Sequence, residues 1–488
     1  MTRQCLFLAS VLIACIAGLP GSLLAQTTYY VRTSGNDLLA SGLSPAKAFR
    51  TIQRAVSLCN GNSGGFTVVV GPGTYAETVT LTSLSGAGNG TISNHNRIIG
   101  DITGSLTGDA PGAVIISGGS TRNYGIQVTS RTYWDFAGLT IRDQKLYGIT
   151  ITGGRGFNIS SCAIKPPPGT NVGIHASSTD IVLNSNSFER TGATGHCAYI
   201  TAASSGYITF RNNRFNMTGQ AYHTSFFRAN KGWGGQSWNP SNLASGFSTM
   251  YPGFTLGLVA LSLSPSVATV ITIENNVGTD CMAGIGVYAT GNSSSSVTVS
   301  SNSMTGCLYP FYVYCDANSR GSLVNNIATD SYYPAYGYLV GGRIDGLLQN
   351  TIAAALPSTA KSVTGVITGD PRFADARAGN FALLPGSPAM DAGSAWNVPT
   401  HDIAGRMRPW DGNRDGLIGY DLGAYEYSGS GGLRITRWDQ RDQLIFSRGK
   451  LPIVMPKATP APNPNLADSN GNGILDILEN VLGALFGN

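Results

Sequence analysis

The sequence predicts an all-β protein: a right-handed parallel β-helix, or solenoid, with an N-terminal helical cap and a short C-terminal tail made of a calcium loop and a helix. Charged residues make up only 12% of the chain and Gly accounts for 64 of 488 residues, a composition that favours short strands joined by tight turns. A strand-like segment also returns about every 25 residues, with Asn at a fixed position. Such a period is typical of solenoids, in which each repeat stacks on the next.

Residues 1–25 are expected to form a signal peptide. Arg3 precedes an apolar run from Cys5 to Gly18, and Leu-Leu-Ala occupies 23–25, which is the layout of a secretory leader. The protein is therefore expected to be secreted or held at the cell surface. A competing interpretation reads residues 12–15 as a lipobox, but apolar sequence continues beyond it, so a lipoprotein is disfavoured. No later stretch reaches the roughly 20 apolar residues that a transmembrane helix needs.

Residues 26–362 are expected to form the solenoid with its N-terminal cap. Ser44 and Pro45 suit the start of a helix. Apolar residues at 48, 52, 55, 56 and 59 follow at helical spacing, before Asn60-Gly61,. We therefore predict an amphipathic helix over 44–59 that covers the first coil, where an open stack of strands would expose its edge.

Eight repeated segments follow the cap. Each alternates apolar and polar residues, as expected for a half-buried strand, and the segments begin at residues 134, 157, 181, 208, 271, 297, 321 and 345. Their sixth position is occupied in the last six by Asn186, Asn213, Asn276, Asn302, Asn326 and Asn350. Side-chain amides stacked in this way can bond to one another, which predicts an asparagine ladder. An antiparallel sandwich or a propeller is disfavoured, because propeller blades need longer repeats.

Two cysteines occupy the same position in adjacent repeats. Cys281 and Cys307 are each the eleventh residue of their repeat, so stacking would place them about 4.8 Å apart. This spacing suits a disulfide. Two buried free thiols are the alternative, and both remain open.

Both ends of this region resemble a known family. Residues 29–77 (YYVRTSGND, SPAKAFRTIQRAV, VVVGPGTYAE) are similar to the opening of secreted bacterial parallel β-helix proteins of the pectin-lyase-like superfamily. Residues 369–427 (GDPRF, FALLPGSPAMDAG, DLGAYEY) resemble the closing module of such chains, and we assign 363–450 to this module. The superfamily includes pectate lyases, alginate lyases, polygalacturonases and proteins with no demonstrated reaction. The resemblance therefore implies a polysaccharide ligand more strongly than it implies a reaction.

The C-terminal tail carries the most specific motif. A Pro-rich linker, 451–465, leads into 466–488, where the pattern D-x-[DN]-x-[DN]-G-x5-E predicts a calcium loop,. The expected ligands are Asp468, Asn470, Asn472, the Ile474 carbonyl, Asp476 and Glu479,. A solvated polar turn is the alternative. The loop resembles those of dockerins, although a dockerin has two. The apolar helix that follows predicts a docking partner for the tail.

A second candidate calcium loop lies in the closing module. Asp411, Asn413 and Asp415 match the first positions of the motif, but Leu422 stands at position 12 and the acid, Asp421, comes one place early. A polar turn is the preferred interpretation here.

Candidate catalytic residues surround the long interval in the repeats. β-Elimination on a uronate polymer needs a base and groups that neutralise the substrate carboxylate. Arg211 and Arg214 immediately precede the interval, and Lys231 lies within it. Aromatic and imidazole side chains suited to sugar rings are Tyr222, His223, Trp233 and Trp238,. The catalytic motifs of polygalacturonases and pectate lyases are absent from the sequence, so catalytic residues cannot be assigned by analogy with either family.

These observations predict a secreted polysaccharide-binding protein that is monomeric, with cleavage by β-elimination left open. The alternative is a non-catalytic structural or adhesive protein of the cell surface. The formal net charge of +5 is spread along the chain without a basic block, so a nucleic-acid partner is not expected.

Overall fold

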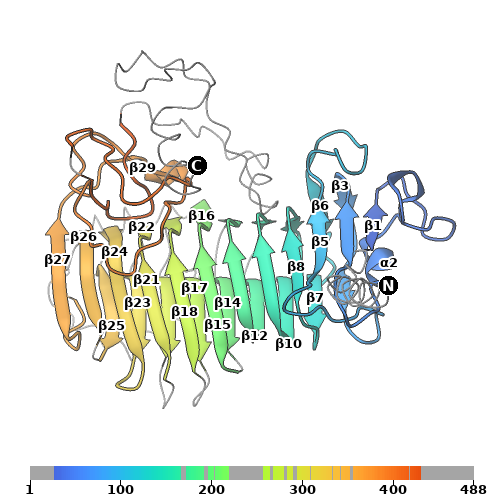
Figure 1. Cartoon of the computed structure of the whole chain (residues 1–488), viewed down its shortest axis with the longest axis horizontal. Coiled ribbons are helices and arrows are strands. Elements are labelled where there is room, and N and C mark those ends of the chain that lie inside the picture. The colour runs from blue at the N-terminus through green and yellow to red at the C-terminus, as the bar shows by residue number, and fades with distance from the viewer. Residues whose placement is uncertain are drawn as a thin grey trace, which may run out of the picture. The chain divides into compact units, whose positions relative to one another are not determined.

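The computed structural model describes residues 27–429, except 166–171, 192–195, 203, 219–256, 264–267, 280–282, 290–293, 308, 332, 341, 352–355 and 417. The chain divides into two compact units, Met1–Leu444 and Ile445–Asn488, and all the described residues belong to the first. Its strands follow one another around a coil and pair in parallel with the coils before and after (Figure 1). The protein is a parallel β-helix, as the sequence predicts.

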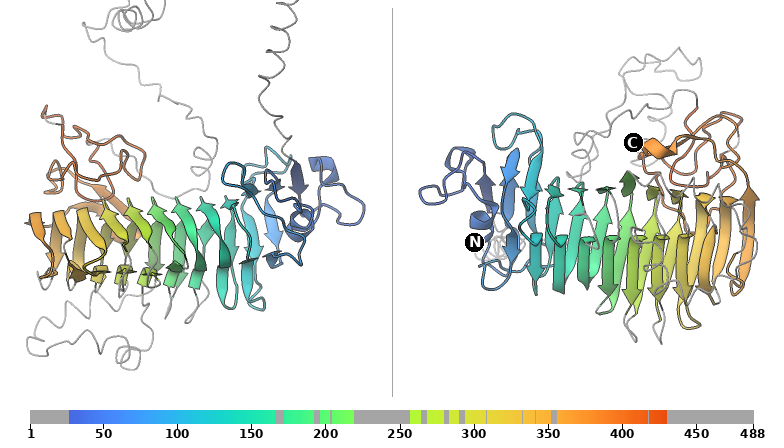
Figure 2. Two further views of the ribbon diagram at one scale, coloured as in Figure 1. Left: turned by 60° about the horizontal axis from the view of Figure 1, so that its bottom comes forward. Right: turned by 180° about the vertical axis from the view of Figure 1, so that it is seen from behind.

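Each coil contributes strands to three parallel stacks, which two further views also display (Figure 2). The first stack contains β1 (Thr28–Val31), β2 (Thr67–Val70), β5 (Asn96–Gly100), β8 (Trp134–Ala137), β15 (Gly206–Arg211), β18 (Thr269–Glu274), β21 (Ser296–Ser300) and β27 (Ser362–Thr368). The second contains β3 (Gly73–Tyr75), β6 (Val114–Ser117), β9 (Thr140–Arg142), β11 (Ala163–Ile164), β13 (Ser187–Thr191), β16 (Arg214–Thr218), β19 (Val277–Thr279) and β22 (Ser303–Thr305).

The third stack contains β4 (Val79–Leu81), β7 (Tyr124–Thr129), β14 (His196–Ala202), β17 (Gly257–Leu263), β20 (Ala283–Ala289), β23 (Tyr309–Cys315) and β25 (Ala335–Leu339). Four longer strands bend from one stack into another: β10 (Tyr147–Ser160), β12 (Val172–Asn184), β24 (Arg320–Ser331) and β26 (Arg343–Thr351). The C-terminal half of β27 follows β26 into the second stack.

The register explains the repeat in the sequence. Trp134 pairs with Phe157, Phe157 with Ile181, and Ile181 with Ile208, and all four side chains are buried. Because side chains alternate between the two faces of a strand, equivalent residues of successive coils meet inside the solenoid and form one core along its axis.

Buried asparagines join the coils at the turn between the first and second stacks. Asn276 Nδ2 donates to Asn302 Oδ1 at 3.0 Å, and Asn302 Nδ2 donates to Asn326 Oδ1 at 3.1 Å. The residue before each Asn adopts a left-handed backbone conformation, as Asn275 (φ 54°) and Asn325 (φ 51°) do, which Asn and Ser tolerate better than most residues. The hydrogen-bonded row comprises Asn186, Asn213, Asn276, Asn302 and Asn326.

The prediction that Asn350 continues this row is wrong. Asn326 pairs with Leu347, whereas Asn350 lies opposite Thr329. The last coils are shorter than the repeat, and Leu347 and Leu348 are buried in this strand while Asn350 is exposed. Burial of the two leucines therefore sets the register here.

The N-terminal cap is helical, but it does not form one helix over 44–59. A 3-10 turn, η1 (Pro45–Lys47), and a short helix, α2 (Ile52–Val56), are separated by extended chain. Thr51, rather than Ser44, caps α2 by accepting from the Arg54 amide, and the Glu77 carboxylate accepts from the first two amides of the helix, those of Ile52 and Gln53. Carboxylates stabilise the positive end of a helix, so α2 begins where these acceptors lie.

The closing module packs against the second stack. It includes β28 (Phe373–Asp375), η3 (Ala376–Ala378) and β29 (Asn380–Leu383). Leu422 packs with Ile327 and Leu348 of the solenoid, and the Ala424 amide donates to Ser303 Oγ at 3.0 Å.

A buried ion pair organises the centre of the module. Arg408 Nη1 lies 2.5 Å from Glu426 Oε1, and neither side chain is exposed. Arg408 also donates to the Gly423 carbonyl at 2.8 Å and to Asn275 Oδ1 of the solenoid at 3.4 Å. Burial raises the pKa of Glu426, and the positive charge of Arg408 opposes this shift.

Several predicted features lie outside the described residues: the signal peptide, the tail with its calcium loop, and Cys281. Cys307 is buried. Because its proposed partner is outside the described residues, the choice between a disulfide and stacked thiols stays a prediction. In the part of the chain that the structure describes, no helix is sufficiently long and apolar to cross a bilayer.

Candidate functional site

Two neighbouring rows of side chains line the outward face of the first stack near its N-terminal end. One contains Arg97, Asp135 and Asn158, and the other contains His95 and Tyr133. Trp134 and Phe136 of β8 are buried, so the residues between and beside them, Tyr133 and Asp135, face outward. The register places Asp135 opposite Arg97 on one side and Asn158 on the other. Polar and aromatic groups far apart in the sequence are thereby brought together.

His95 and Asp135 form a hydrogen-bonded pair in these rows. His95 Nδ1 lies 2.6 Å from Asp135 Oδ1, and the two side chains are only 16% and 22% exposed. A carboxylate that accepts from the Nδ1 proton leaves the lone pair of a neutral imidazole on Nε2. The pair has the arrangement of a general base and the group that orients it.

Neighbouring residues hold the Asp135 carboxylate in place. Asn158 Nδ2 donates to Asp135 Oδ1 at 2.7 Å, and Arg97 Nε lies 3.6 Å from Asp135 Oδ2. The Arg97 side chain is 45% exposed, so its guanidinium is accessible to an anionic ligand. We call His95, Arg97, Tyr133, Asp135 and Asn158 the His95 cluster.

A glycine makes room for the aromatic member of the cluster. The Tyr133 and His95 rings are 5.2 Å apart. In the next coil, a Cβ atom added to Gly156 would lie 2.2 Å from a Tyr133 ring carbon, and φ at Gly156 is +78°. Only glycine satisfies both conditions without strain, so Gly156 allows the tyrosine ring to lie over the following coil.

The outward face continues beyond Gly156 with a second polar group. Arg155 Nη2 lies 2.5 Å from Asp180 Oδ2, and Asp180 Oδ1 accepts from the Tyr207 amide at 3.1 Å. Burial raises the pKa of the Tyr207 hydroxyl, and the nearby negative charge of Asp180 adds to this shift. Tyr207 is 43% exposed and remains a neutral hydroxyl at ordinary pH.

Arg211, a predicted catalytic residue, lies further along the same stack. Its Nε is 3.9 Å from Glu274 Oε1, and its side chain is 46% exposed. Burial raises the pKa of Glu274, while the positive charge of Arg211 opposes this effect. At this distance the pair is loose, so Arg211 remains accessible to a ligand.

Arg214, the second predicted catalytic residue, contacts the closing module. Its Nη2 donates to the Tyr425 hydroxyl at 2.8 Å, and its guanidinium lies 5.9 Å from the Tyr425 ring centroid. Arg211 and Arg214 belong to different stacks, on either side of the turn at Asn213. The structure therefore gives Arg214 a docking contact and does not bring the two arginines into one site.

The long insertion containing Lys231 and the sugar-binding candidates Tyr222, His223, Trp233 and Trp238 lies outside the described residues, as do the calcium ligands of the C-terminal tail.

A row of aromatic side chains also follows the third stack, where the rings pack against one another. Ring centroids are 5.9 Å apart between Tyr124 and Tyr147, 4.7 Å between Tyr147 and His175, and 5.7 Å between His175 and Tyr199. Burial lowers the pKa of His175. The two middle rings, Tyr147 and His175, have an aromatic neighbour on each face. Their faces are therefore not available to sugar rings, and the row instead stabilises the stacking of the coils.

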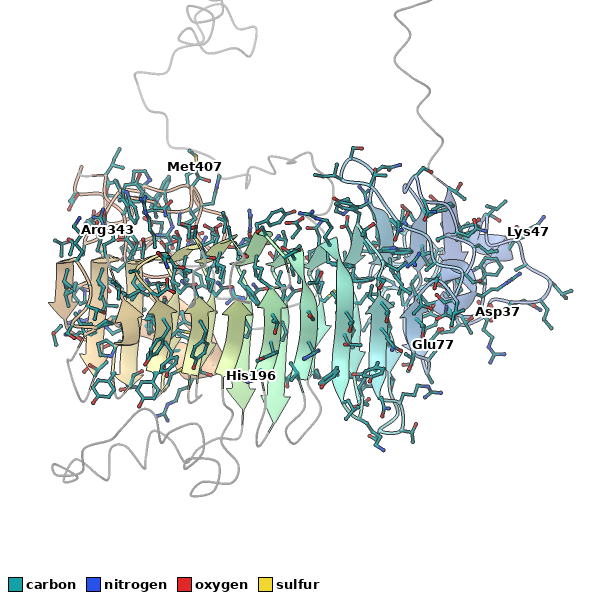
Figure 3. The ribbon with its side chains drawn as sticks, turned by 90° about the horizontal axis from the view of Figure 1, so that it is seen from below. Asp37, Lys47, Glu77, His196, Arg343 and Met407 are labelled. Carbon is teal, nitrogen blue, oxygen red and sulfur yellow. The ribbon has the colours of Figure 1, made fainter. Side chains whose placement is uncertain are left out.

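Arginine stacking recurs where the closing module meets the first stack. The Arg343 guanidinium lies 4.3 Å from the Trp396 ring centroid, and its Nη2 is 2.5 Å from Asp345 Oδ2. Figure 3 places Arg343 at the far end of the solenoid from the N-terminal cap, where Lys47 is labelled. This cation is part of the packing between module and solenoid.

The second candidate calcium loop is closed by its own hydrogen bonds. Asn413 Nδ2 donates to Asp391 Oδ2 at 3.0 Å and to Asp415 Oδ2 at 2.9 Å. Asp421 is buried and accepts from the Asp391 and Tyr427 amides. Across the described ranges, no group of three or more His, Cys, Asp or Glu residues is arranged to hold a metal ion. These residues bond to one another, and calcium binding by this loop stays a prediction.

Sequence analysis did not identify the His95 cluster. His95 precedes the first regular repeat, and Asp135 and Asn158 belong to the two repeats that lack the fixed Asn. The available signal was the alignment itself: Asp135 and Asn158 both hold the second position of their segments. Following the outward positions into the preceding coil leads to Arg97, two residues after His95.

Comparisons with known proteins yield structural likeness only. No protein family model matches the chain, and no curated protein matches it. A pectate lyase structure has a TM-score of 0.44 at 14% identity, covering 82% of this chain and 96% of its own. A rhamnogalacturonan lyase has a TM-score of 0.38 at 12% identity, covering 70% and 85%.

A third similar structure is a mannuronic acid specific family 6 polysaccharide lyase from human gut microbiota. Its TM-score is 0.37 at 12% identity, covering 70% of this chain and 73% of its own. We derive no activity from these likenesses.

Proposed function

We propose that this protein is secreted, binds an extracellular acidic polysaccharide along the outward face of the first stack, and cleaves it by β-elimination at the His95 cluster. The 2.6 Å contact between His95 Nδ1 and Asp135 Oδ1 carries the proposal, because it supplies an oriented base. Arg97 beside it, and Arg155 and Arg211 further along, supply positive charge for uronate carboxylates.

The residues suit the steps of the reaction. A uronate carboxylate held near Arg97 makes the proton on the adjacent C5 more acidic, and His95 Nε2 removes that proton while Asp135 stabilises the resulting imidazolium. The electron pair of the C5–H bond forms the C4=C5 double bond as the bond from C4 to the glycosidic oxygen breaks. That oxygen takes a proton from the imidazolium, which restores neutral His95.

The test is the absorbance of the unsaturated product near 235 nm with polygalacturonate or alginate as substrate. His95→Gln is expected to lower the initial rate by at least ~100-fold, while His401→Gln, an exposed histidine outside the cluster, leaves it unchanged. Arg97→Met is expected to raise KM and to lower kcat, because Arg97 both contacts the substrate carboxylate and makes the C5 proton more acidic. Equal rates for His95→Gln and the unaltered protein would refute the assignment of the base.

A non-catalytic binding or adhesive role is the second candidate. The packing of Arg214 against Tyr425 favours this role, because an arginine that contacts the closing module is not available to act on a substrate. Sedimentation with insoluble polysaccharide, without product on any polyuronate, would select this function. Loss of binding in Arg97→Met and Arg211→Met would still place it on the first stack, and no binding at all would reject both candidates.

We also propose that residues 468–479 bind calcium and that the tail 466–488 docks onto a partner. The support is the unbroken loop motif with Glu479 at position 12,. Isothermal titration of the full chain with Ca²⁺ is expected to give a binding signal that Glu479→Gln abolishes and Asp411→Asn preserves. The reverse pattern would assign the ion to the closing module instead.

A further inference from the structure

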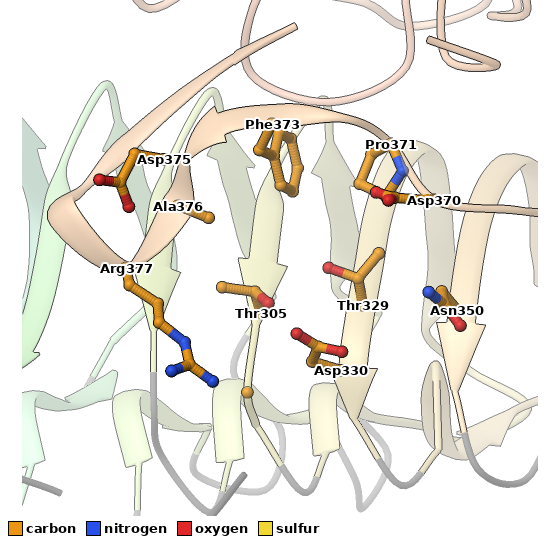
Figure 4. A pocket seen from close by; sticks show the side chains of 11 residues that line it. Thr305, Thr329, Asp330, Asn350, Asp370, Pro371, Phe373, Asp375, Ala376 and Arg377 are labelled. Carbon is orange, nitrogen blue, oxygen red and sulfur yellow. The ribbon is translucent and has the colours of Figure 1, made fainter. Parts of the chain in front are cut away.

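A pocket of about 290 Å³ lies between the second stack and the closing module (Figure 4). The solenoid contributes Thr305, Thr329, Asp330 and Asn350, and the module contributes residues from β28 and η3. This volume is at the lower end of the range for small-molecule sites, so it suits a single sugar unit rather than a long segment of polymer. The pocket lies on a different stack from the His95 cluster.

The change of register in the last coils builds one wall of the pocket. Asn350 is opposite Thr329 rather than Asn326, which places its amide at the pocket instead of in the buried row. On the other wall, Asp375 caps η3 by accepting from the Ala378 amide at 3.1 Å. Asp370 Oδ1 similarly accepts from the Arg372 amide at 2.8 Å. Both carboxylates are thus held in position by the backbone.

The hydroxyls of two nearly buried threonines point into the pocket. Thr305 is 7% exposed and Thr329 is 4% exposed, and Figure 4 shows both side chains directed into the space between solenoid and module. Within the described structure, the backbone carbonyls of these residues accept hydrogen bonds, whereas neither hydroxyl has a hydrogen-bond partner. Neither hydroxyl is among the fully buried unpartnered atoms of the described structure, so both stay accessible from the pocket and can bond a ligand rich in hydroxyl groups.

The remaining lining defines the charge and shape of that ligand. Phe373 forms an aromatic wall whose ring is held edge-on by Phe381, at 5.1 Å and 69°. The lining contains three carboxylates, those of Asp330, Asp370 and Asp375, and one guanidinium, that of Arg377. Three carboxylates against one cation leave the lining with a net negative charge, which opposes the entry of an anion. Carboxylates also accept hydrogen bonds from sugar hydroxyls and pair with protonated amines.

We propose that this pocket is a second carbohydrate site that binds a pyranose unit without a carboxylate, either neutral or bearing a protonated amine. Thr305, Thr329 and Asn350 bond its hydroxyls, Phe373 packs against its ring, and the three aspartates exclude uronic acids. The first stack is proposed to bind acidic sugars, whereas this pocket is proposed to bind sugars without a carboxylate. The pocket proposal does not depend on the proposed cleavage of polyuronates at the His95 cluster.

The test uses three monosaccharides that share one ring: glucose, glucosamine and glucuronate, titrated against the full chain and followed by saturation-transfer NMR. Glucose and glucosamine are expected to bind at least about tenfold more tightly than glucuronate, the equivalent of losing one charge-assisted hydrogen bond. Thr329→Val, which conserves shape, is expected to weaken glucose binding about three- to tenfold. Asp375→Asn is expected to reduce the discrimination against glucuronate.

Glu189→Gln is the matched control, because it removes an exposed carboxylate from β13 of the same stack, outside the pocket. It is expected to leave all three affinities unchanged. Equal or tighter binding of glucuronate would overturn the charge argument. Absence of binding by all three sugars, or affinities unaffected by both Thr329→Val and Asp375→Asn, would overturn the site. Because these variants spare the His95 cluster, product formation on polyuronates reports separately on the proposed function.

Discussion

Replacing Asn302 with alanine is expected to lower the free energy of unfolding by about 3 kcal/mol or more. Asn302 is fully buried, and its Nδ2 donates to the Ile273 and Ser300 carbonyls and to Asn326 Oδ1. Its Oδ1 accepts from the backbone and side-chain amides of Asn276. Alanine leaves these groups buried without partners. Equilibrium unfolding in urea measures the loss.

Asn350→Ala provides the control for this prediction. Asn350 holds the same place in the sequence repeat, but it lies outside the hydrogen-bonded row and is exposed. Its replacement is expected to change the free energy of unfolding by no more than about 0.5 kcal/mol. Equal losses from both variants would contradict the role assigned to the row.

Replacing Arg408 with methionine is expected to cost about 3–5 kcal/mol, because it leaves the Glu426 carboxylate buried without its cation. It also removes donors to the Gly423 carbonyl and to Asn275 Oδ1, which connect the closing module to the solenoid. Equilibrium unfolding in urea, followed by circular dichroism, measures the change in the free energy of unfolding.

A double variant separates charge from packing at this position. Adding Glu426→Gln to Arg408→Met removes the unpaired charge and is expected to recover part of the loss. Arg414→Met, at an exposed arginine of the same module, is expected to have little effect. If the double variant is no more stable than Arg408→Met alone, the ion pair is not the source of the stabilisation.

The solenoid could be predicted from the sequence because its geometry is periodic. Inward residues such as Trp134, Phe157 and Ile181 recur in phase, and their burial fixes the register. The same reasoning failed at Asn350, where residue type matched the repeat but the buried leucines beside it determined the pairing. It also failed for the helix over 44–59, because apolar spacing does not reveal side-chain caps from distant residues such as Glu77.

The candidate site was harder to predict, because its residues come from three successive coils. Arg211 was singled out as a cation beside a long insertion, and it does face outward. His95 carried no such signal, since its partner Asp135 is 40 residues away. Two neighbouring outward rows became recognisable as one site only when the strand register was known.

The contact between Asn213 and Asn276 has a wider consequence. Their side chains bond at 3.0 Å although the two residues are 63 apart in the sequence, and the same geometry joins other pairs that are 24 to 27 apart. Two coils thus stay in phase even where 63 residues, rather than about 25, separate equivalent positions. Evolution can lengthen, shorten or exchange the intervening segments one at a time, acquiring new ligand specificity while the scaffold beneath is inherited unchanged.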